Sequence, residues 1–261
     1  MIGIFDSGVG GLAVFQEIDK LLPGADILYL ADNAAFPYGL RSPEFIKNRT
    51  SVITRTLLTR GAGLVVVACN TATVVAIQHL RENFNIPFVG VEPPVKVASQ
   101  AAADNEPIYV LLTKNTATGR KYAELVKKFG DMKRVKAFSL PLLAQVVEDG
   151  TFSDPQVAGR VARLLARRIG KPPQGAKVVL GCTHYVFLKG LFRNSFGPDV
   201  EIFDPSRAVA DQVVRILEAG GMEIKERGQR LFLCTGDAQI FARNAAKLLG
   251  LKIPEVELLE L

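Results

Sequence analysis

Two cysteines that follow apolar segments are the residues best suited to chemistry in this sequence. Leu-Val-Val-Val-Ala runs into Cys-Asn-Thr at 69–71, and Lys-Val-Val-Leu-Gly runs into Cys-Thr-His at 182–184. Ligands bind at the carboxyl ends of strands in parallel sheets, and a helix N-terminus just beyond Cys69 lowers a thiol pKa. One such cysteine alone is more typical of a buried packing residue. Because Cys182 repeats the pattern, with His184 beside it to share a proton, we expect a pair of acid/base thiols.

Two loops carry further polar groups that could meet a ligand. The segment 6–11, Asp-Ser-Gly-Val-Gly-Gly, follows the first apolar run, and its backbone N–H groups could bind an anion. It is neither a dinucleotide fingerprint nor a Walker A loop, and Asp6 could simply cap a turn. We expect Asp6 to lie near one thiol and Ser7 to contact substrate. The Pro-Tyr-Gly turn later in the chain would place Tyr38 and Gly39 against the ligand.

Short apolar runs alternate with helix-length stretches along the chain, which predicts an α/β fold with mainly parallel sheets. The runs are rich in Val, Ile, Leu and Phe and do not alternate with polar residues, as in strands buried on both faces. Ser42-Pro43, Asp154-Pro155 and Ser206 open predicted helices that end near Gly61, Gly170 and Gly220. The predicted strands are Gly3–Phe5, Ile27–Leu30, Leu64–Ala68, Pro87–Val91, Ile108–Leu112, Val178–Gly181, Glu201–Phe203 and Leu231–Leu233.

A faint internal repeat relates the two cysteine segments. After each cysteine comes a helix-length stretch, then an apolar strand that ends in an acidic residue and a proline. The proline follows Cys69 by 24 residues and Cys182 by 23 residues. We therefore expect two similar α/β domains related by pseudo-twofold symmetry, with one cysteine from each facing an active site between them.

Composition limits the remaining function classes. The 261 residues carry a formal net charge of +6 and three dispersed cysteines, which suits reduced thiols rather than disulfides or a metal site. We expect Cys234 to have a packing role. No apolar run reaches the ~18–20 residues that span a bilayer, and no secretion signal is evident, so we expect a cytoplasmic protein without a membrane partner. No aromatic platform interleaves the basic residues and no nucleic-acid-binding motif is visible, which argues against nucleic acid as a partner.

Taken together, the motifs resemble the glutamate racemases of the aspartate/glutamate racemase superfamily. The resemblance runs over nearly the whole chain, and its specific parts are Asp-Ser-Gly-Val-Gly-Gly at 6–11, Pro-Tyr-Gly at 37–39, Cys-Asn-Thr-Ala at 69–72 and Gly-Cys-Thr-His-Tyr at 181–185. It implies a first domain of residues 1–93 and 206–261 and a second domain of residues 94–205. Because related aspartate racemases usually have an acidic residue where His184 stands, the histidine favours glutamate as substrate.

The resemblance also implies residue roles in racemisation without a cofactor. Cys69 and Cys182 would be the catalytic acid/bases, supported by Asp6 and His184 respectively, and Glu148 matches an acidic site residue. Cys182 would deprotonate L-glutamate and Cys69 would deprotonate D-glutamate. The positions that match substrate-binding residues are Asp6, Ser7, Tyr38, Gly39, Asn70, Thr71, Thr183 and His184, and Thr113 and Thr116 match a threonine-bearing loop.

The sequence departs from the family pattern at four positions near these motifs. Ala31 stands where glycine is usual, Asn33 where threonine is usual, Gly119 where serine is usual and Leu140 where cysteine is frequent. These differences bear on substrate contacts and leave the two-thiol chemistry intact.

Several alternatives stay open at this point. An aspartate or hydantoin racemase is the nearest one, followed by a two-domain binding protein without activity and by a second, nucleic-acid-binding activity of the basic surface. A homodimer is open as well as a monomer. Family membership implies a purpose, the supply of D-glutamate for bacterial peptidoglycan.

Overall fold

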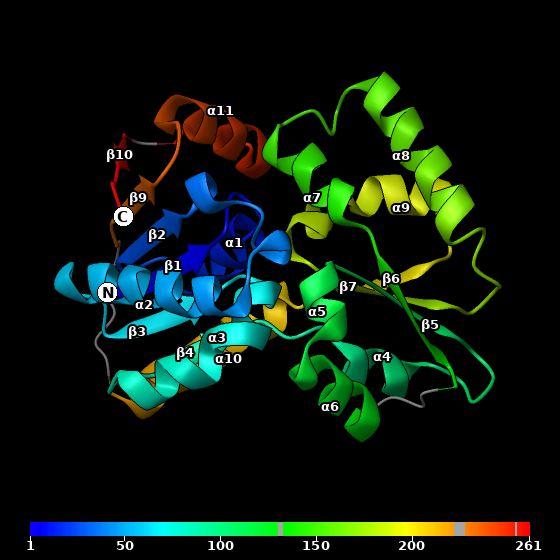
Figure 1. Ribbon diagram of the computed structural model, residues 1–261, viewed down its shortest axis with the longest axis horizontal. Coiled ribbons are helices and arrows are strands. Elements are labelled where there is room, and N and C mark those ends of the chain that lie inside the picture. The colour runs from blue at the N-terminus through cyan, green and yellow to red at the C-terminus, as the bar shows by residue number, and fades with distance from the viewer. Residues whose placement is uncertain (130–132, 222–227, 254) are drawn as a thin grey trace.

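Two parallel β-sheets form the framework of the chain (Figure 1). The computed structural model describes residues 1–129, 133–221, 228–253 and 255–261. Within these residues the large sheet has the order β10-β9-β2-β1-β3-β4 and the small sheet the order β6-β5-β7-β8. The strands are β1 (Ile2–Asp6), β2 (Ile27–Ala31), β3 (Leu64–Val67), β4 (Phe88–Gly90), β5 (Ile108–Leu112), β6 (Val135–Ser139), β7 (Lys177–Gly181), β8 (Glu201–Phe203), β9 (Arg230–Cys234) and β10 (Val256–Leu258).

The expected α/β class with parallel sheets is confirmed. All eight predicted strands are present, with bounds that differ by at most one residue at either end. Strands β6 and β10 were not predicted. Both lie at the edge of a sheet, and their side chains are partly exposed, so neither has the continuous buried apolar run used to find the others.

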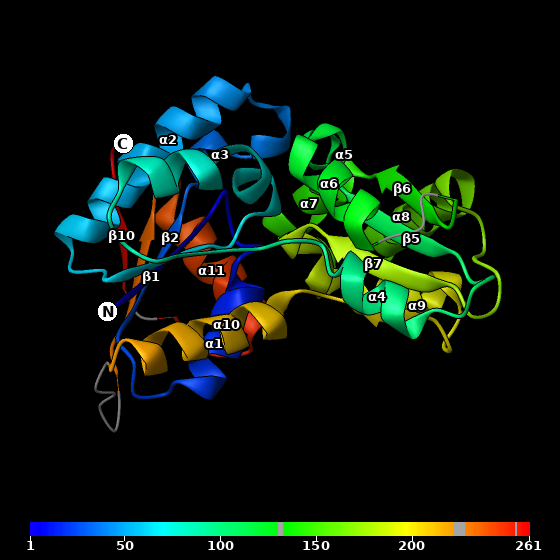
Figure 2. The same cartoon turned by 90° about the horizontal axis from the view of Figure 1, so that it is seen from below.

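Helices cover both faces of each sheet, as Figure 2 shows from below. The α-helices are α1 (Leu12–Leu21), α2 (Pro43–Thr59), α3 (Asn70–Asn83), α4 (Val95–Ala101), α5 (Lys114–Thr118), α6 (Arg120–Phe129), α7 (Pro141–Glu148), α8 (Pro155–Arg168), α9 (Lys189–Phe196), α10 (Ser206–Ala219) and α11 (Ala238–Leu249). Short 3₁₀ helices are η1 (Asn33–Ala35), η2 (Tyr38–Leu40) and η3 (Thr183–Leu188).

All three predicted helix starts are confirmed, and two of them have a side-chain cap. Ser42 accepts a hydrogen bond from the N–H of Phe45, and Asp154 caps α8 in the same way. Ser206 does not cap α10, because it is the first helical residue and the cap position is Pro205. The carboxylate of Asp204 instead accepts the N–H of Ser206, which satisfies one free donor of the helix start.

The internal repeat of the sequence corresponds to a repeat of topology. Strands β2-β1-β3-β4 of the large sheet have the same order as β6-β5-β7-β8 of the small sheet. In this correspondence β3 is equivalent to β7, and each is followed by one of the two cysteines. The chain leaves the large sheet after β4, forms the small sheet, and returns through α10 to add β9 and β10 (Figures 1 and 2).

Alternate residues of each strand enter separate apolar layers, as expected of strands buried on both faces. On the large sheet, Ile4 and Tyr29 pack toward α1, α10 and α11, whereas Phe5 and Leu30 pack toward α2 and α3. The first of these layers continues without a break to the side of the small sheet that α7, α8 and α9 cover. The two sheets are therefore joined by a shared core as well as by the chain. In the described part of the chain, no helix has the length and apolar composition to cross a bilayer.

Candidate active site

Cys69 lies at the point where β3 gives way to α3. It is the N-cap residue of α3, and its Sγ accepts a hydrogen bond from the N–H of Ala72 at 3.5 Å. The thiol lies 3.8 Å from the Oγ of Ser7, which follows β1, the neighbouring strand. Only 6% of the residue is exposed. The local geometry at the helix N-terminus is thus the one that the sequence predicted.

The predicted lowering of the Cys69 pKa is wrong. Burial raises the pKa of the thiol to about 12, and the negative charge of Asp6 raises it further, while the hydrogen bond from Ala72 lowers it only in part. The helix end was visible in the sequence, but the enclosed surroundings and the neighbouring carboxylate were not. A charge on Cys182 also raises the pKa of Cys69, so the two sulfurs interact electrostatically across the same site.

Cys182 lies one residue beyond β7 and contacts His184. Its Sγ is 3.9 Å from Nδ1 of His184, and the other ring nitrogen, Nε2, is 2.9 Å from Oε2 of Glu148. That carboxylate oxygen also accepts the N–H of Val9 at 2.9 Å. Burial lowers the pKa of His184, but the hydrogen bonds to Cys182 and Glu148 outweigh it and leave the pKa raised. A charged imidazolium is therefore favoured beside the Cys182 thiol.

Asp6 connects the two sides of the site. Its Oδ1 accepts the N–H of Gly8, and its Oδ2 accepts the hydroxyl of Thr183, each at 2.9 Å. The side chain is fully buried, and this burial raises the pKa of the carboxyl to about 6, although the nearby charge of His184 lowers it. Asp6 is thus the last residue of β1, next to Ser7, and it binds the hydroxyl of Thr183, the residue that follows Cys182.

The glycine-rich loop 6–11 allows the two sheets to approach closely. A Cβ at Gly8 would lie 2.2 Å from the Glu148 carboxylate, and one at Gly10 would lie 2.3 Å from Nδ1 of His184. The loop N–H groups do bind anionic groups, but these are the protein's own carboxylates at Asp6 and Glu148. Each sheet with the helices that cover it forms a sheet unit. The glycines are needed here because side chains at these positions would prevent contact between the two sheet units.

The loop after β2 contributes Tyr38 to the surroundings of the site. The peptide bond before Pro37 is cis, and Tyr38 is buried with its hydroxyl donating to Oδ2 of Asp32 at 2.6 Å. Burial raises the pKa of Tyr38, and charges on Asp32 and Cys69 raise it further, which places the ring in the electrostatic range of Cys69. Arg49 forms an ion pair with Asp32, a partner that the sequence did not indicate.

Asn33, one of the departures from the family pattern, has a clear role in this loop. Its side-chain oxygen accepts the N–H groups of Thr235 and Gly236, at 3.2 and 2.8 Å, and so fixes the loop that follows β9. Asn33 therefore joins the loop after β2 to the loop after β9. Cys234, at the end of β9, is fully buried, in accord with its expected packing role.

Three threonine hydroxyls form a cluster between the two sheet units. Thr71 of α3 lies 3.0 Å from Thr113 and 3.3 Å from Thr116, and those two lie 3.0 Å apart. Gly39 packs against Thr113, since a Cβ there would lie 3.1 Å from it. Asn70 is 2% exposed, and its side-chain oxygen has no hydrogen-bond partner among the described residues. A buried acceptor of this kind is suited to a donor group of a ligand.

Some residues near the site were not predicted from the sequence, because they belong to none of the motifs. Asn244 of α11 donates to the carbonyl oxygen of Glu148, Asn115 donates to the carbonyls of Tyr38 and Arg41, and the hydroxyl of Tyr29 donates to the carbonyl of Gly8. Each joins segments far apart in the sequence.

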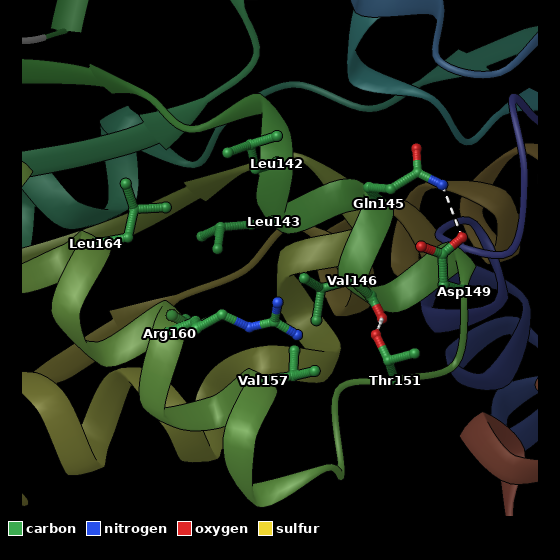
Figure 3. A pocket seen from close by; sticks show the side chains of 10 residues that line it. Leu142, Leu143, Gln145, Val146, Asp149, Thr151, Val157, Arg160 and Leu164 are labelled. Atoms are coloured by element: carbon green, nitrogen blue, oxygen red, sulfur yellow. Dashed lines mark hydrogen bonds between the residues drawn. The ribbon is translucent and has the colours of Figure 1, made fainter.

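A separate cavity of about 420 Å³ lies between α7 and α8 (Figure 3). Its lining is mainly aliphatic, including Leu143, Val146, Val157 and Leu164, and the Arg160 side chain extends from α8 toward α7 among them (Figure 3). It contains neither thiol and none of the residues described above, so it is distinct from the candidate active site.

Comparison with known proteins identifies the class that this fold and this site define. The profile of the family described as Asp/Glu/Hydantoin racemase matches residues 2–213, and the chain belongs to that family. Within it, a glutamate racemase of Methylococcus capsulatus is 41% identical over 252 residues, which cover 95% of this chain and 91% of the relative. The resemblance to glutamate racemases expected from the cysteine motifs is confirmed.

Solved structures agree over the whole fold. Escherichia coli glutamate racemase in complex with L-glutamate and the activator UDP-MurNAc-ala has a TM-score of 0.86 and 30% identity, with 99% of this chain and 97% of that chain covered. Glutamate racemase from Francisella tularensis in complex with D-glutamate has a TM-score of 0.83 and 25% identity, with coverage of 99% and 97%.

Proposed function

We propose that this chain is a cofactor-independent glutamate racemase in which Cys69 and Cys182 transfer protons at opposite faces of the α-carbon. The observation that carries the proposal is the enclosure of both thiols in one polar cluster. Asp6 connects its two sides, because it adjoins Ser7 beside one thiol and binds Thr183 beside the other. The relatives crystallised with L-glutamate and with D-glutamate support glutamate as the substrate.

We propose the same division of the chain as the sequence predicts. Residues 1–93 and 206–261 would form the domain that carries Cys69, and residues 94–205 the domain that carries Cys182. The strand order that the two sheets have in common supports this division, as do the two chain crossings after β4 and β8. Substrate would bind between the domains, with one sulfur on either side.

Each direction of the reaction uses one thiolate and one thiol. From L-glutamate, the Cys182 thiolate would take the α-proton, and the electron pair would remain on the α-carbon. The Cys69 thiol would then donate its proton to the opposite face and become the thiolate. His184, charged through its contact with Glu148, would stabilise the Cys182 thiolate, while Asp6 would act beside Cys69. The reverse sequence converts D-glutamate to L-glutamate.

The raised pKa of Cys69 assigns a role to the substrate itself. Burial and the negative charge of Asp6 disfavour a thiolate at Cys69. A bound α-ammonium group would bring a positive charge and so lower the pKa of the thiol. The free side-chain oxygen of Asn70 is a suitable acceptor for that ammonium group. Deprotonation would then accompany binding, which limits the time that a reactive thiolate is present.

The remaining contacts would hold the carboxylates and close the site. Hydroxyls of Ser7 and Thr71 are donors suited to carboxylate oxygens, and the Thr183 hydroxyl, which donates to Asp6, would become one once that bond opens. The Tyr38 hydroxyl is engaged by Asp32, so Tyr38 and Gly39 would contribute the ring and the main chain as a wall. Fixed donors in a site without bulk water would stabilise the negative charge that develops on the substrate.

Serine variants of the cysteines test the proposal. Cys69→Ser and Cys182→Ser should each lower the rate of glutamate racemisation by at least about 10²-fold, since a positioned proton-transfer group contributes about 10²–10⁴-fold. Circular dichroism of L-glutamate and D-glutamate solutions, with no added cofactor, measures the rate. Cys234→Ser is the matched control, because this third buried thiol lies at the end of β9 and should leave the rate unchanged. Wild-type activity in either active-site variant would refute the two-thiol mechanism.

Exchange with solvent assigns the faces. In deuterated water, Cys69→Ser should still exchange the α-proton of L-glutamate, and Cys182→Ser that of D-glutamate. The opposite pattern would reverse the assignment. Rates measured with aspartate and with hydantoins, beside glutamate, distinguish the related racemases. We further propose that the enzyme acts in the cytoplasm and supplies D-glutamate for peptidoglycan synthesis.

A further inference from the structure

Helix α11 packs beside the large sheet (Figure 1), and two of its side chains donate to the main chain of the turn that follows α7. The side-chain amide of Asn244 donates to the carbonyl oxygen of Glu148 at 2.6 Å. One helical turn further on, Lys247 donates to the carbonyl oxygen of Gly150, also at 2.6 Å. Two side chains of α11 therefore hold the main chain of a turn that belongs, with α7, to the other sheet unit.

Asn244 is an unusual residue for its position. It lies 3% exposed among the buried residues of α11, which are otherwise the apolar Phe241, Ala245 and Leu249. A buried amide costs free energy unless it is hydrogen-bonded, so its bond to Glu148 accounts for its presence. The turn is shaped to receive it: Gly150 has a φ of +68°, and a Cβ there would lie 2.5 Å from the Asn244 side-chain oxygen.

The hydrogen bond from Asn244 acts on Glu148, whose carboxylate contacts His184 beside Cys182. Glu148 is the last residue of α7, and its carbonyl has no partner within the helix. Its carboxylate accepts from Val9 and contacts His184. We infer that Asn244 is a positioning residue, which fixes the end of α7 so that the Glu148 carboxylate meets His184. This inference rests on the function proposed above for His184.

The alternative is that Asn244 serves only to attach α11 to the turn. Lys247 offers a matched control, because Lys247→Met removes a bond to the same turn without touching Glu148. Asn244→Ala removes the donor, and Asn244→Asp keeps the size but offers only acceptors to the carbonyl. Thermal unfolding of each variant shows whether a loss of activity is caused by a loss of stability.

The pH dependence of kcat/KM distinguishes the two explanations. The charged and titratable groups that act on His184 are Cys182, Glu148 and Asp6. A misplaced Glu148 carboxylate supports the imidazolium less, so the pKa of His184 falls. We expect both Asn244 variants to lose about tenfold in kcat/KM and to shift the alkaline limb down by about half a unit to one unit. The loss must be equal in both directions, because the equilibrium constant between enantiomers is one.

Lys247→Met should retain kcat/KM within about twofold and keep the wild-type profile. An Asn244→Ala profile that superimposes on wild type, or an equal shift in Lys247→Met, would overturn the inference. Titration of the His184 imidazole by NMR provides a readout that does not depend on the substrate. If wild type failed to racemise glutamate, the proposed function would fail, yet a lowered His184 pKa in Asn244→Ala alone would still support the positioning role.

Discussion

Asp6→Asn should stabilise the fold at neutral pH while removing activity. Asp6 is fully buried, and its pKa rises from 3.8 to about 6 on folding. The folded state therefore binds this proton more tightly than the unfolded state, and stability falls as pH rises from about 4 to about 6. A shift of about two units corresponds to about 3 kcal/mol of unfolding free energy, at about 1.4 kcal/mol per unit. Asparagine fits the same space and does not titrate.

Urea unfolding followed by far-ultraviolet circular dichroism at pH 4, 6 and 8 measures this effect. The quantity to compare is the free-energy difference between Asp6→Asn and wild type, which should grow by about 2.5 kcal/mol in favour of the variant between pH 4 and pH 8, because part of the total is already present at pH 4. Constant effects, such as an altered hydrogen bond to Thr183, cancel in that comparison. Racemisation should fall by at least about 10²-fold, since the group acts beside Cys69.

A partly buried aspartate, Asp204, offers a control of opposite sign. Burial raises the pKa of Asp204, but the hydrogen bonds from Lys189 and Ser206 and the positive charge of Lys189 together outweigh it and leave the pKa lowered. Asp204 thus contributes stability above the unfolded pKa, and this contribution is lost as pH falls through the folded pKa. Asp204→Asn should therefore become less stable relative to wild type as pH rises. A pH-independent difference for Asp6→Asn would refute the reasoning that burial of this charge opposes folding.

Two further predictions concern packing around the site. Tyr38→Phe should lower the free energy of unfolding in urea by about 1–2 kcal/mol, because it removes a buried hydrogen bond to Asp32. Tyr122→Phe is the control and should be neutral or stabilising, because the buried Tyr122 hydroxyl has no partner among the described residues. An equal loss of stability in both variants would contradict this prediction. Gly10→Ala should lower racemisation more than about tenfold, because its Cβ would lie 2.3 Å from the His184 ring, and wild-type activity in this variant would show that the two sheet units need not approach so closely.

The interior of the fold was predictable because its strands are buried on both faces. The continuous apolar run Ile108–Leu112 has the same bounds in the sequence prediction and in the structure. Val135–Ser139 was missed since an edge strand exposes part of its side chains and so resembles a loop in the sequence. Helix starts with a side-chain cap were local enough to predict, whereas Ser206 showed that a serine at a helix start need not be the cap.

The candidate site was predictable where its chemistry is local in sequence. Cys182 and His184 lie two residues apart, so the motif alone brought them together. The contact of Asn244 with Glu148 spans 96 residues and depends on the return of the chain to the large sheet. The pKa of Cys69 failed as a prediction for the same reason, because the helix N-terminus is local but its enclosure and Asp6 are not.

The burial of both sulfurs also determines how the protein meets oxidants and alkylating reagents. Each cysteine is 6% exposed, so we expect a reagent to reach it mainly when contacts such as that between Thr183 and Asp6 separate. The rate of cysteine modification would then depend on how often these contacts open and not on the intrinsic reactivity of the thiolate. A ligand that holds the two units together protects both cysteines at once, although it need not touch either of them.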